Sequence, residues 1–338
     1  MPATLRDVAN AAEVHPGTAS RAMNPETQHL VNEATAKRVR KAAEALGYVP
    51  NPMARSLKTN RSQSLGVVIP DIANPLFPPM IRGFEDVVAE AGYNVLITNT
   101  DNDEKRELQQ IAGLRARHVE GLIVATALLN HSVLRKVVDD GLPVVLVNRT
   151  DPDLATASVT GDDQSGIRQL VRHLRSLGHR RIAHIAGPQS TSTGVTRFRA
   201  FRQELQDQGL EYDESLVKFV DQYHASDGAQ ALSDLFAEGR KFSAVIAAND
   251  LLALGCYDTL RDLGLECPRD LSVVGFNDML FVDRVHPPLT TVHVPQYDVG
   301  AEAGRLMLEQ LRKESKPVLS VLLPVSLIVR SSTAHFVP

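Results

Sequence analysis

The sequence predicts an α/β protein, with a small helical module at the N-terminus and a long part made of parallel sheets covered by helices. Apolar residues recur with helical spacing between Thr4 and Gly47. From Ser64 onward, short runs of Val, Ile and Leu alternate with amphipathic stretches, which is typical of buried parallel strands joined by helices. With 338 residues, 43% of them hydrophobic, the chain can fill more than one core.

Charge is distributed unevenly between the two parts. Residues 1–61 carry nine Lys or Arg and five Asp or Glu, a net charge of +4, whereas residues 62–338 carry 27 and 35, a net charge of −8. This asymmetry suits contact with a polyanion through the N-terminal module alone. From charge alone, an ordinary basic surface exposed to solvent explains the excess equally well.

The remaining composition argues against several classes of protein. Cys256 and Cys267 have no second cysteine pair and no histidine at metal-ligand spacing, so we expect simple thiols and neither a metal site nor a cofactor. No apolar run approaches the roughly 18 residues of a membrane helix. The first residues also lack the charged-then-apolar pattern of a signal peptide, and we therefore expect a cytosolic protein.

The N-terminal module is predicted to contain three helices. Thr4 followed by Asp7 forms a capping-box pattern at the start of the first. Pro16 starts the second, because proline lacks the N–H that would be unpaired at the first helical position. Asn32 can cap the third, and Gly47 ends it. In the second helix the residues expected to face outward, where a recognition helix meets base edges and phosphates, are Pro16, Gly17, Thr18, Ser20, Arg21 and Asn24.

The run Thr4-Leu-Arg-Asp-Val-Ala-Asn-Ala-Ala-Glu-Val-His-Pro-Gly-Thr-Ala-Ser-Arg-Ala-Met-Asn24 resembles the headpiece of the lactose-repressor (LacI/GalR) family of bacterial regulators. The resemblance continues through Leu46-Gly-Tyr-Val-Pro-Asn51 and Ala54-Arg-Ser-Leu-Lys58. It implies a helix-turn-helix DNA-binding domain over residues 1–49. The DNA-contacting residues that it implies are Thr4, His15, Pro16, Gly17, Thr18, Ser20, Arg21, Asn24, Tyr48, Asn51, Ala54, Leu57 and Lys58.

The headpiece departs from the family pattern at three positions. Glu13 stands where the family has a turn Gly, and it suits that turn poorly if positive φ is needed. His15 replaces a Ser cap, and Ala19 replaces a core Val. Pro16 and Gly17 fall on the variable base-reading positions but offer almost no side-chain hydrogen bonds, so we expect weak direct readout there.

Residues 50–61 are predicted to form a hinge helix and linker. Asn51 can cap about two turns of helix, which is too short to be stable alone. The resemblance implies that this helix pairs with its copy on DNA and that Leu57, flanked by Ala54 and Lys58, wedges into the minor groove. Without the resemblance, a plain linker with Leu57 packed on the next domain is the simpler interpretation.

The long part is predicted to contain two similar halves of about four strands each. The expected strands are residues 65–69, 95–98, 121–124, 144–147, 182–185, 217–220, 244–247 and 272–275. We expect the chain to cross between the halves near Gly161-Asp162 and at Pro287–Val292. A third crossing, near Leu322 to Ser326, is implied by the resemblance alone.

By resemblance the long part is a two-lobed core like that of a periplasmic sugar-binding protein. The N-terminal lobe would comprise residues 62–161 and 293–322, and the C-terminal lobe residues 162–292 and 323–338. The residues to which the resemblance assigns effector contacts are Leu76, Phe77, Asn148, Arg197, Tyr223, Asn249 and Asn277. Asn148, Asn249 and Asn277 each follow a predicted strand, where parallel sheets bind ligands, although such Asn residues are also ordinary in loops.

These residue types suit a sugar, because amides and Arg bond hydroxyls while apolar faces cover the ring. Asn148 and Asn277 stand where sugar-binding relatives often have Asp. With Arg197 retained, the pocket is more cationic, which is compatible with a sugar phosphate or an acidic sugar.

The sequence therefore predicts a homodimeric transcriptional regulator, a repressor, that binds a near-palindromic DNA operator under control of a small-molecule effector. An enzyme is disfavoured because the nucleotide-binding, serine-nucleophile and zinc-protease motifs are missing from the sequence. An exported or cytosolic sugar-binding protein without a regulatory role is the alternative, but it would have no use for the headpiece. The tail after Arg330 has no heptads, which disfavours a coiled-coil tetramer.

Overall fold

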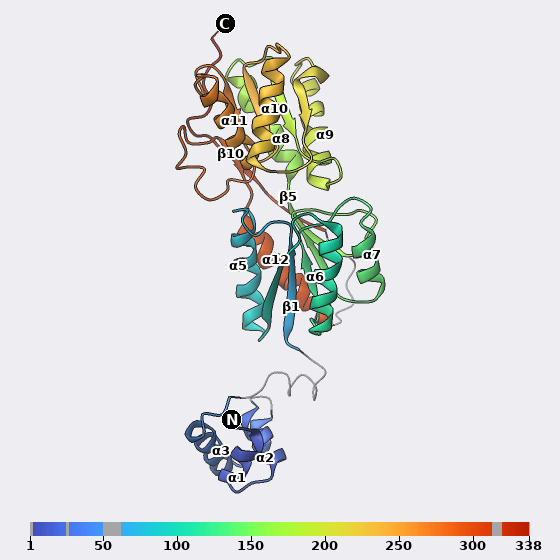
Figure 1. Ribbon diagram of the computed structural model, residues 1–338, viewed down its shortest axis with the longest axis vertical. Helices are drawn as coiled ribbons and strands as arrows, with labels where there is room; N and C mark the ends of the chain where they lie inside the picture. The colour runs from blue at the N-terminus through green and yellow to red at the C-terminus, as the bar shows by residue number, and fades with distance from the viewer. Residues whose placement is uncertain (1–2, 25–26, 50–61, 313–319, 338) are drawn as a thin grey trace. The chain divides into compact units, whose positions relative to one another are not determined.

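The computed structural model describes residues 3–24, 27–49, 62–312 and 320–337. Contacts divide the chain into two compact units, Met1–Ser62 and Gln63–Pro338 (Figure 1). Asn51, Ala54, Leu57 and Lys58, which the sequence assigns to DNA contact through the hinge, lie outside the described residues. Their role stays a prediction.

The N-terminal unit is a small bundle of helices, as expected. Its helices are α1 (Leu5–Ala11), α2 (Pro16–Met23), the 3₁₀ turn η1 (Gln28–Leu30) and α3 (Glu33–Ala45). Small side chains let the helices approach closely around a core of alanines with Val8 and Val39. The Thr4 capping box forms, and Asn32 caps α3 by accepting from the N–H of Ala34 at 2.9 Å. Glu13 adopts φ 51°, so the turn does require the left-handed conformation that favours glycine.

The second unit contains two lobes, each built on a parallel sheet. The first lobe holds β1 (Ser64–Ile69), α5 (Phe77–Glu90), β2 (Asn94–Asn99), α6 (Glu104–Ala116), β3 (Leu122–Val124), α7 (Ser132–Asp139), β4 (Val144–Val147), β5 (Ala157–Gly161), α12 (Gln296–Leu311) and β11 (Ser320–Leu323). The second holds α8 (Asp163–Ser176), β6 (Ile182–Ala186), α9 (Ser192–Asp207), the 3₁₀ turn η2 (Glu214–Leu216), β7 (Val217–Phe219), α10 (Ala225–Ala237), β8 (Ala244–Ala247), α11 (Asp250–Asp262) and β9 (Ser272–Val274). Two short strands, β10 (Thr291–His293) and β12 (Ser326–Ile328), pair antiparallel with each other.

Successive side chains of the first sheet point to opposite faces, and both faces are covered by helices. Val67 and Ile69 of β1 share a core with α5 and α12, whereas Val68 shares a core with α6 and α7. This double burial explains why the strand reads as an unbroken apolar run rather than as an alternating one. Gly300 of α12 allows close contact with α5, because a Cβ there would lie 1.8 Å from the carbonyl oxygen of Met80.

The second lobe repeats the arrangement around a smaller sheet. Helix α8 packs on α9, and α10 packs on α11 (Figure 1). His184 of β6 is fully buried, its Nδ1 lies 2.8 Å from the carbonyl oxygen of Ile246, and its ring packs on Phe201. Burial lowers the pKa of His184 to about 4, so the ring is neutral in the folded protein.

The strand orders define where a ligand site is expected. Within the described residues, the first sheet has the order β11-β5-β4-β3-β1-β2 and the second the order β7-β6-β8-β9. In each sheet the chain reverses its direction of winding, next to β1 and next to β6, and the carboxyl ends of strands at such a reversal leave a crevice. The expectation of about four strands in the first half was wrong, since β5 and β11 complete a six-stranded sheet. The apolar pattern does not predict strand β5, because its Ser and Thr interrupt the run of apolar residues.

The chain passes between the lobes three times in the described part. It leaves the first sheet after β5, returns through β10 to α12, and runs from β11 to β12. Among the described helices, none is long and apolar enough to cross a membrane.

Candidate functional site

Helix α2 presents a mostly polar surface at its N-terminal end. Pro16 and Arg21 are exposed, and Gly17, Thr18 and Ser20 are half-exposed, whereas the alanines of the opposite face are buried. His15 caps the helix, because its Nδ1 accepts a hydrogen bond from the N–H of Gly17 at 3.1 Å. The histidine therefore performs the capping role that a serine would have, and the start of α2 stays ordered.

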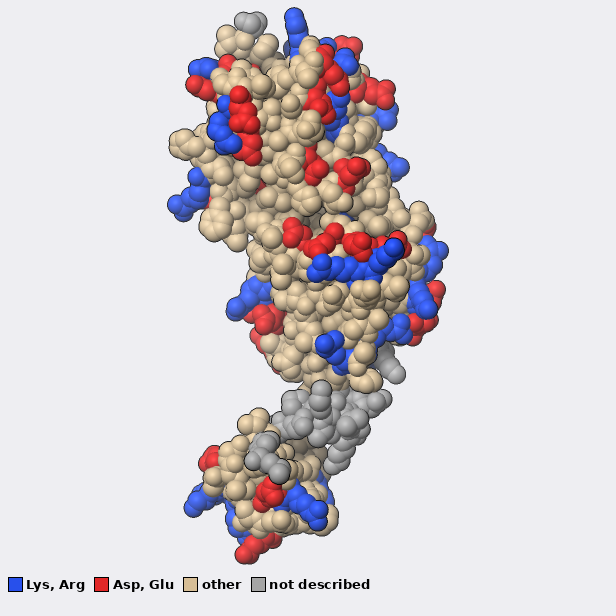
Figure 2. Space-filling view, in the orientation of Figure 1, with Lys and Arg blue, Asp and Glu red and all other residues tan. Residues whose placement is uncertain are grey.

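Three further residues that are expected to contact DNA also make structural contacts within the headpiece. Thr4 is committed to the capping box with Asp7. Asn24 ends α2, and Tyr48 packs half-buried against the headpiece core, where burial raises the pKa of its hydroxyl. On the face of this unit that Figure 2 shows, Lys and Arg side chains are interspersed with acidic ones and form no continuous basic patch.

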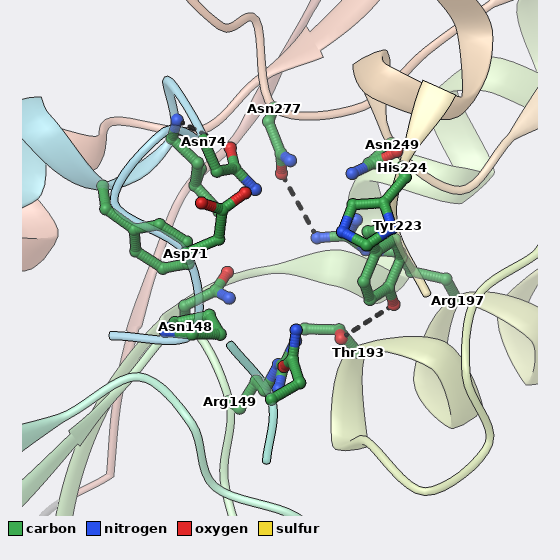
Figure 3. Close-up of a pocket in the computed structure, with 14 residues that line it drawn as sticks. Asp71, Asn74, Asn148, Arg149, Thr193, Arg197, Tyr223, His224, Asn249 and Asn277 are labelled. Atoms are coloured by element: carbon green, nitrogen blue, oxygen red, sulfur yellow. Dashed lines mark hydrogen bonds between the residues drawn. The ribbon is translucent and has the colours of Figure 1, made fainter. Parts of the chain in front are cut away.

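The second unit contains a pocket between its two lobes, where strand ends from both sheets meet. All seven residues expected to contact an effector line it. The full lining is Pro70, Asp71, Asn74, Leu76, Phe77, Asn102, Asn148, Arg149, Thr193, Arg197, Tyr223, His224, Asn249 and Asn277 (Figure 3). The space between these atoms is about 500 Å³, including the part open to solvent.

One side of the pocket is apolar and another is hydroxylic. Leu76 and Phe77, at the start of α5, are buried and form the apolar wall. From the second lobe, the hydroxyl of Tyr223 lies 3.1 Å from that of Thr193 (Figure 3). Gly187 leaves room for this tyrosine, since a Cβ there would lie 2.2 Å from the Tyr223 hydroxyl oxygen.

Arg197 is held by a full set of partners. Its Nε donates to Asp163 at 2.9 Å, its Nη1 to the carbonyl of Ala248 at 2.6 Å, and its Nη2 to Asn277 Oδ1 at 3.4 Å. The guanidinium also lies 3.8 Å from the centre of the Phe276 ring. Because Asp163 neutralises it, Arg197 does not supply the uncompensated positive charge that the sequence led us to expect.

The three asparagines differ in which side-chain hydrogen-bonding groups remain available to a ligand. Asn249 caps α11 by accepting from the N–H of Leu252 at 2.9 Å, which leaves its amide NH₂ group. Asn277 uses its oxygen for Arg197. Asn148, at φ 63°, holds the left-handed conformation that asparagine tolerates well and stands directly at the end of β4.

Sequence reasoning missed half of the lining. Pro70, Asp71 and Asn74 follow β1, and the rule that ligands bind beyond strand ends could have placed them here. Arg149 follows Asn148 and could have been found in the same way. Thr193 and His224 belong to the starts of helices in the second lobe and gave no signal of their own.

Hydrogen bonds join the two lobes near the pocket, since Thr150 and Ser192 each follow or precede a lining residue in the chain. The N–H of Thr150 donates to Ser192 Oγ, and the N–H of Leu129 donates to the carbonyl of Ser190, both at 2.8 Å. A change in the angle between the lobes would break these bonds.

Two family models match the chain. Residues 4–51 match the bacterial regulatory proteins of the lacI family, and residues 171–333 match a periplasmic binding protein-like domain. The first covers the helical unit, and the second covers most of the second lobe together with α12 and the strands that follow it.

Known proteins resemble the chain over nearly its whole length. The HTH-type transcriptional regulator RegA of Clostridium saccharobutylicum is 34% identical over 98% of this chain and 100% of its own. A structure of the transcriptional regulator CelR in complex with cellobiose is 31% identical, with a TM-score of 0.75 over 98% of this chain and 99% of its own. The Lac repressor dimer bound to operator and the anti-inducer ONPF is 26% identical, with a TM-score of 0.88 over 99% of this chain and 100% of its own.

The headpiece expected from the sequence, the two-lobed α/β core and these full-length relatives agree with one another. The chain belongs to the lacI family of bacterial regulatory proteins, and it is a transcriptional regulator and not an enzyme.

Proposed function

We propose that this regulator binds a near-palindromic DNA operator as a homodimer in the cytoplasm and represses transcription, under control of an effector in the pocket between the lobes. A single headpiece reads few base pairs, and two-fold pairing doubles the contact. The Lac repressor relative, solved as a dimer on its operator, supports this assembly.

The N-terminal end of α2 is the surface proposed to enter the major groove. Arg21 and the hydroxyls of Thr18 and Ser20 supply donors for phosphates and base edges. Pro16 and Gly17 add shape rather than hydrogen bonds, so readout at those base pairs relies on van der Waals contact. The proposed hinge contacts of Asn51, Ala54, Leu57 and Lys58 rest on the family resemblance.

The effector is proposed to be a sugar or a sugar derivative. Asn148, Asn249 and Asn277 can donate to hydroxyls, and Leu76 and Phe77 can cover the apolar face of a ring. The CelR relative was solved with cellobiose, which supports a carbohydrate class.

The observation that carries the proposal is that one chain contains both a helix suited to DNA recognition, with an exposed N-terminal end, and a pocket lined by residues of both lobes. A ligand that contacts both lobes stabilises one arrangement of the lobes relative to another. If the two arrangements differ in operator affinity, the ligand can change that affinity by at most the ratio of its own affinities for the two arrangements.

Selection of operator sites from random duplex DNA by the full-length protein, with and without metabolites extracted from cells, tests this function. We expect a two-fold symmetric sequence to be enriched and the metabolites to change its retention. Arg21→Gln should reduce affinity for that sequence about 10- to 100-fold, because it removes a charge-assisted contact. Lys41→Gln, which removes the same charge from the exposed surface of α3, should reduce it much less. Recovery of no sequence preference would contradict the proposal.

A further inference from the structure

The pocket contains a buried cation that nothing in the described structure neutralises at close range. Arg149 is 5% exposed and lines the pocket from the first lobe. Its Nε has no hydrogen-bond partner, and its guanidinium makes no hydrogen bond or ion pair with any described residue. A buried guanidinium left in this state costs folding free energy, so its retention calls for a compensating partner.

The neighbours of Arg149 are already committed elsewhere. Glu107 is the carboxylate that acts on it electrostatically, but Glu107 accepts a hydrogen bond from Thr126 and lies 3.0 Å from Nε2 of His131. Tyr223, the other stabilising neighbour, pairs with Thr193. Burial lowers the pKa of Arg149, which is the direction expected where desolvation outweighs these attractions.

The rest of the lining does not balance this charge. Arg197 is neutralised by Asp163, while Asn148 and Asn277 contribute no negative charge. Asp71 is an acidic residue of the lining, but it is not among the groups that act on Arg149, and Figure 3 shows Asn148 between the two.

The backbone around the pocket adds to the positive potential. Four long helices begin at the lining, since Leu76, His224 and Asn249 are the N-caps of α5, α10 and α11 and Thr193 lies in the first turn of α9. Helix N-termini carry partial positive charge and unpaired N–H groups, which favour anions. Arg149 and the start of α9 approach the pocket from opposite lobes, so a group held between them would contact both.

We propose that Arg149 is the anion-binding residue of this pocket and that the effector is a small polyhydroxylated molecule carrying one acidic group, a carboxylate or a phosphate. The inference rests on the proposed function, because it names the class of effector that the pocket takes. The acidic group would lie between the Arg149 guanidinium and the Thr193 hydroxyl, with the polyol against Leu76, Phe77 and the three asparagines. A neutral sugar could accept hydrogen bonds from Arg149 but would leave its charge uncompensated.

Calorimetric titration of the full-length protein with matched ligand sets tests the proposal. Each set contains a neutral aldose, its uronic acid and its terminal phosphate, for example glucose, glucuronate and glucose 6-phosphate, with galactose and ribose sets beside it. We expect an acidic member to bind at least 10-fold more tightly than its neutral parent. Binding by phosphate members alone or by carboxylate members alone identifies the acidic group. Equal or tighter binding of the neutral members, or binding of no acidic member at all, overturns the proposal.

Variants then assign the effect to the residue. Arg149→Met should weaken binding of the acidic ligand by about 10- to 100-fold, the range of a charge-assisted hydrogen bond, and Arg149→Lys should weaken it less. Arg135→Met removes the same charge from the exposed surface of α7 and should leave binding unchanged. Undiminished binding by Arg149→Met contradicts the assignment.

A measurement without ligand separates this role from a structural one. Because Arg149→Met removes an uncompensated buried charge, its melting temperature in the absence of ligand should equal or exceed that of the wild type. A clear loss of stability would instead identify Arg149 as a structural partner and overturn the proposal. Arg149→Met should still select the same operator DNA. If the wild-type protein selected no DNA sequence, that result would contradict the proposed regulatory function but not the effector class. The titrations test the effector class separately, because they require no DNA.

Discussion

The guanidinium of Arg197 and the carboxylate of Asp163 lie 2.8 Å apart, with their side chains 4% and 13% exposed. The pair joins the middle of α9 to the first residue of α8 beside the pocket. It fixes Arg197 so that Nη2 reaches Asn277, and it removes the positive charge that an isolated arginine would bring to the ligand.

Replacing Asp163 by Asn should destabilise the protein by about 3–5 kcal/mol, because Arg197 would be left as a buried charge without its counterion. Urea unfolding monitored by circular dichroism measures the change. The double variant with Arg197→Met should recover part of the loss, since it removes both charges. Additive losses would show that the two residues are not coupled.

Gly300→Ala should destabilise the first lobe by about 3 kcal/mol, because its Cβ would lie 1.8 Å from the backbone oxygen of Met80 and force α12 away from α5. Gly113→Ala is the matched control. Its Cβ would meet only the end of Arg117 at 3.5 Å, so it should stabilise α6 by about 0.5–1 kcal/mol. Thermal unfolding of the two variants should shift in opposite directions, and parallel shifts would refute the steric explanation.

Glu13→Gly should stabilise the headpiece by about 0.5–1 kcal/mol, because the turn holds this residue at φ 51°. Glu13→Ala keeps the Cβ and should give no such gain. Hydrogen exchange at the amides of Val8 and Val39, within the headpiece core, reports this stability in the full-length protein. Equal protection in both variants would mean that the turn carries no strain.

His184 should make the protein sensitive to acid. Its pKa is about 4 in the folded protein, against the ordinary 6.5 of an exposed histidine, so the unfolded chain binds the proton first as the pH falls. The stabilisation is complete above pH 6.5 and is lost toward pH 4, by about 2 kcal/mol at pH 5. His184→Asn can keep a donor to the Ile246 carbonyl without titrating. Its stability is expected to fall less than that of the wild type between pH 7.5 and pH 5 in guanidinium unfolding curves, and identical slopes would exclude His184 as the cause.

Leu57→Ala should reduce affinity for the operator about 10-fold more than affinity for unrelated DNA, because a wedge between base steps contributes only where the DNA bends. Filter binding with both duplexes at the same salt concentration measures the difference. Leu57 lies outside the described residues. The experiment therefore tests a role that rests on the family resemblance. Equal losses on both duplexes would support the plain-linker interpretation.

Much of the fold was predictable because local pattern and burial agree. The helix starts at Thr4, Pro16 and Asn32 follow from capping chemistry, and the buried strands are continuous apolar runs. Strand β5 was not predictable in this way. Ser158 is buried in it and pairs with Ser320 Oγ at 3.2 Å, so its polar character reflects a partner 162 residues away.

The sequence was sufficient to predict seven of the residues that line the site, but not which of its charged residues are neutralised by a partner. The seven expected residues line one pocket because strand ends and the family resemblance both point there. Which arginine is neutralised depends on contacts between distant elements, such as Arg197 with Asp163. Sequence reasoning assigned the free charge to Arg197, and only the packed structure shows that Arg149 carries it.

Asn249 caps α11 with its oxygen and turns its amide toward the pocket. Stability and recognition therefore share one side chain, and a mutation that retunes specificity at this position also frays a helix. Asn148 forms no such bond in the described structure, so it can change to Asp, which also tolerates its positive φ, at little structural cost. Divergence toward new effectors should pass through Asn148 early and through Asn249 rarely.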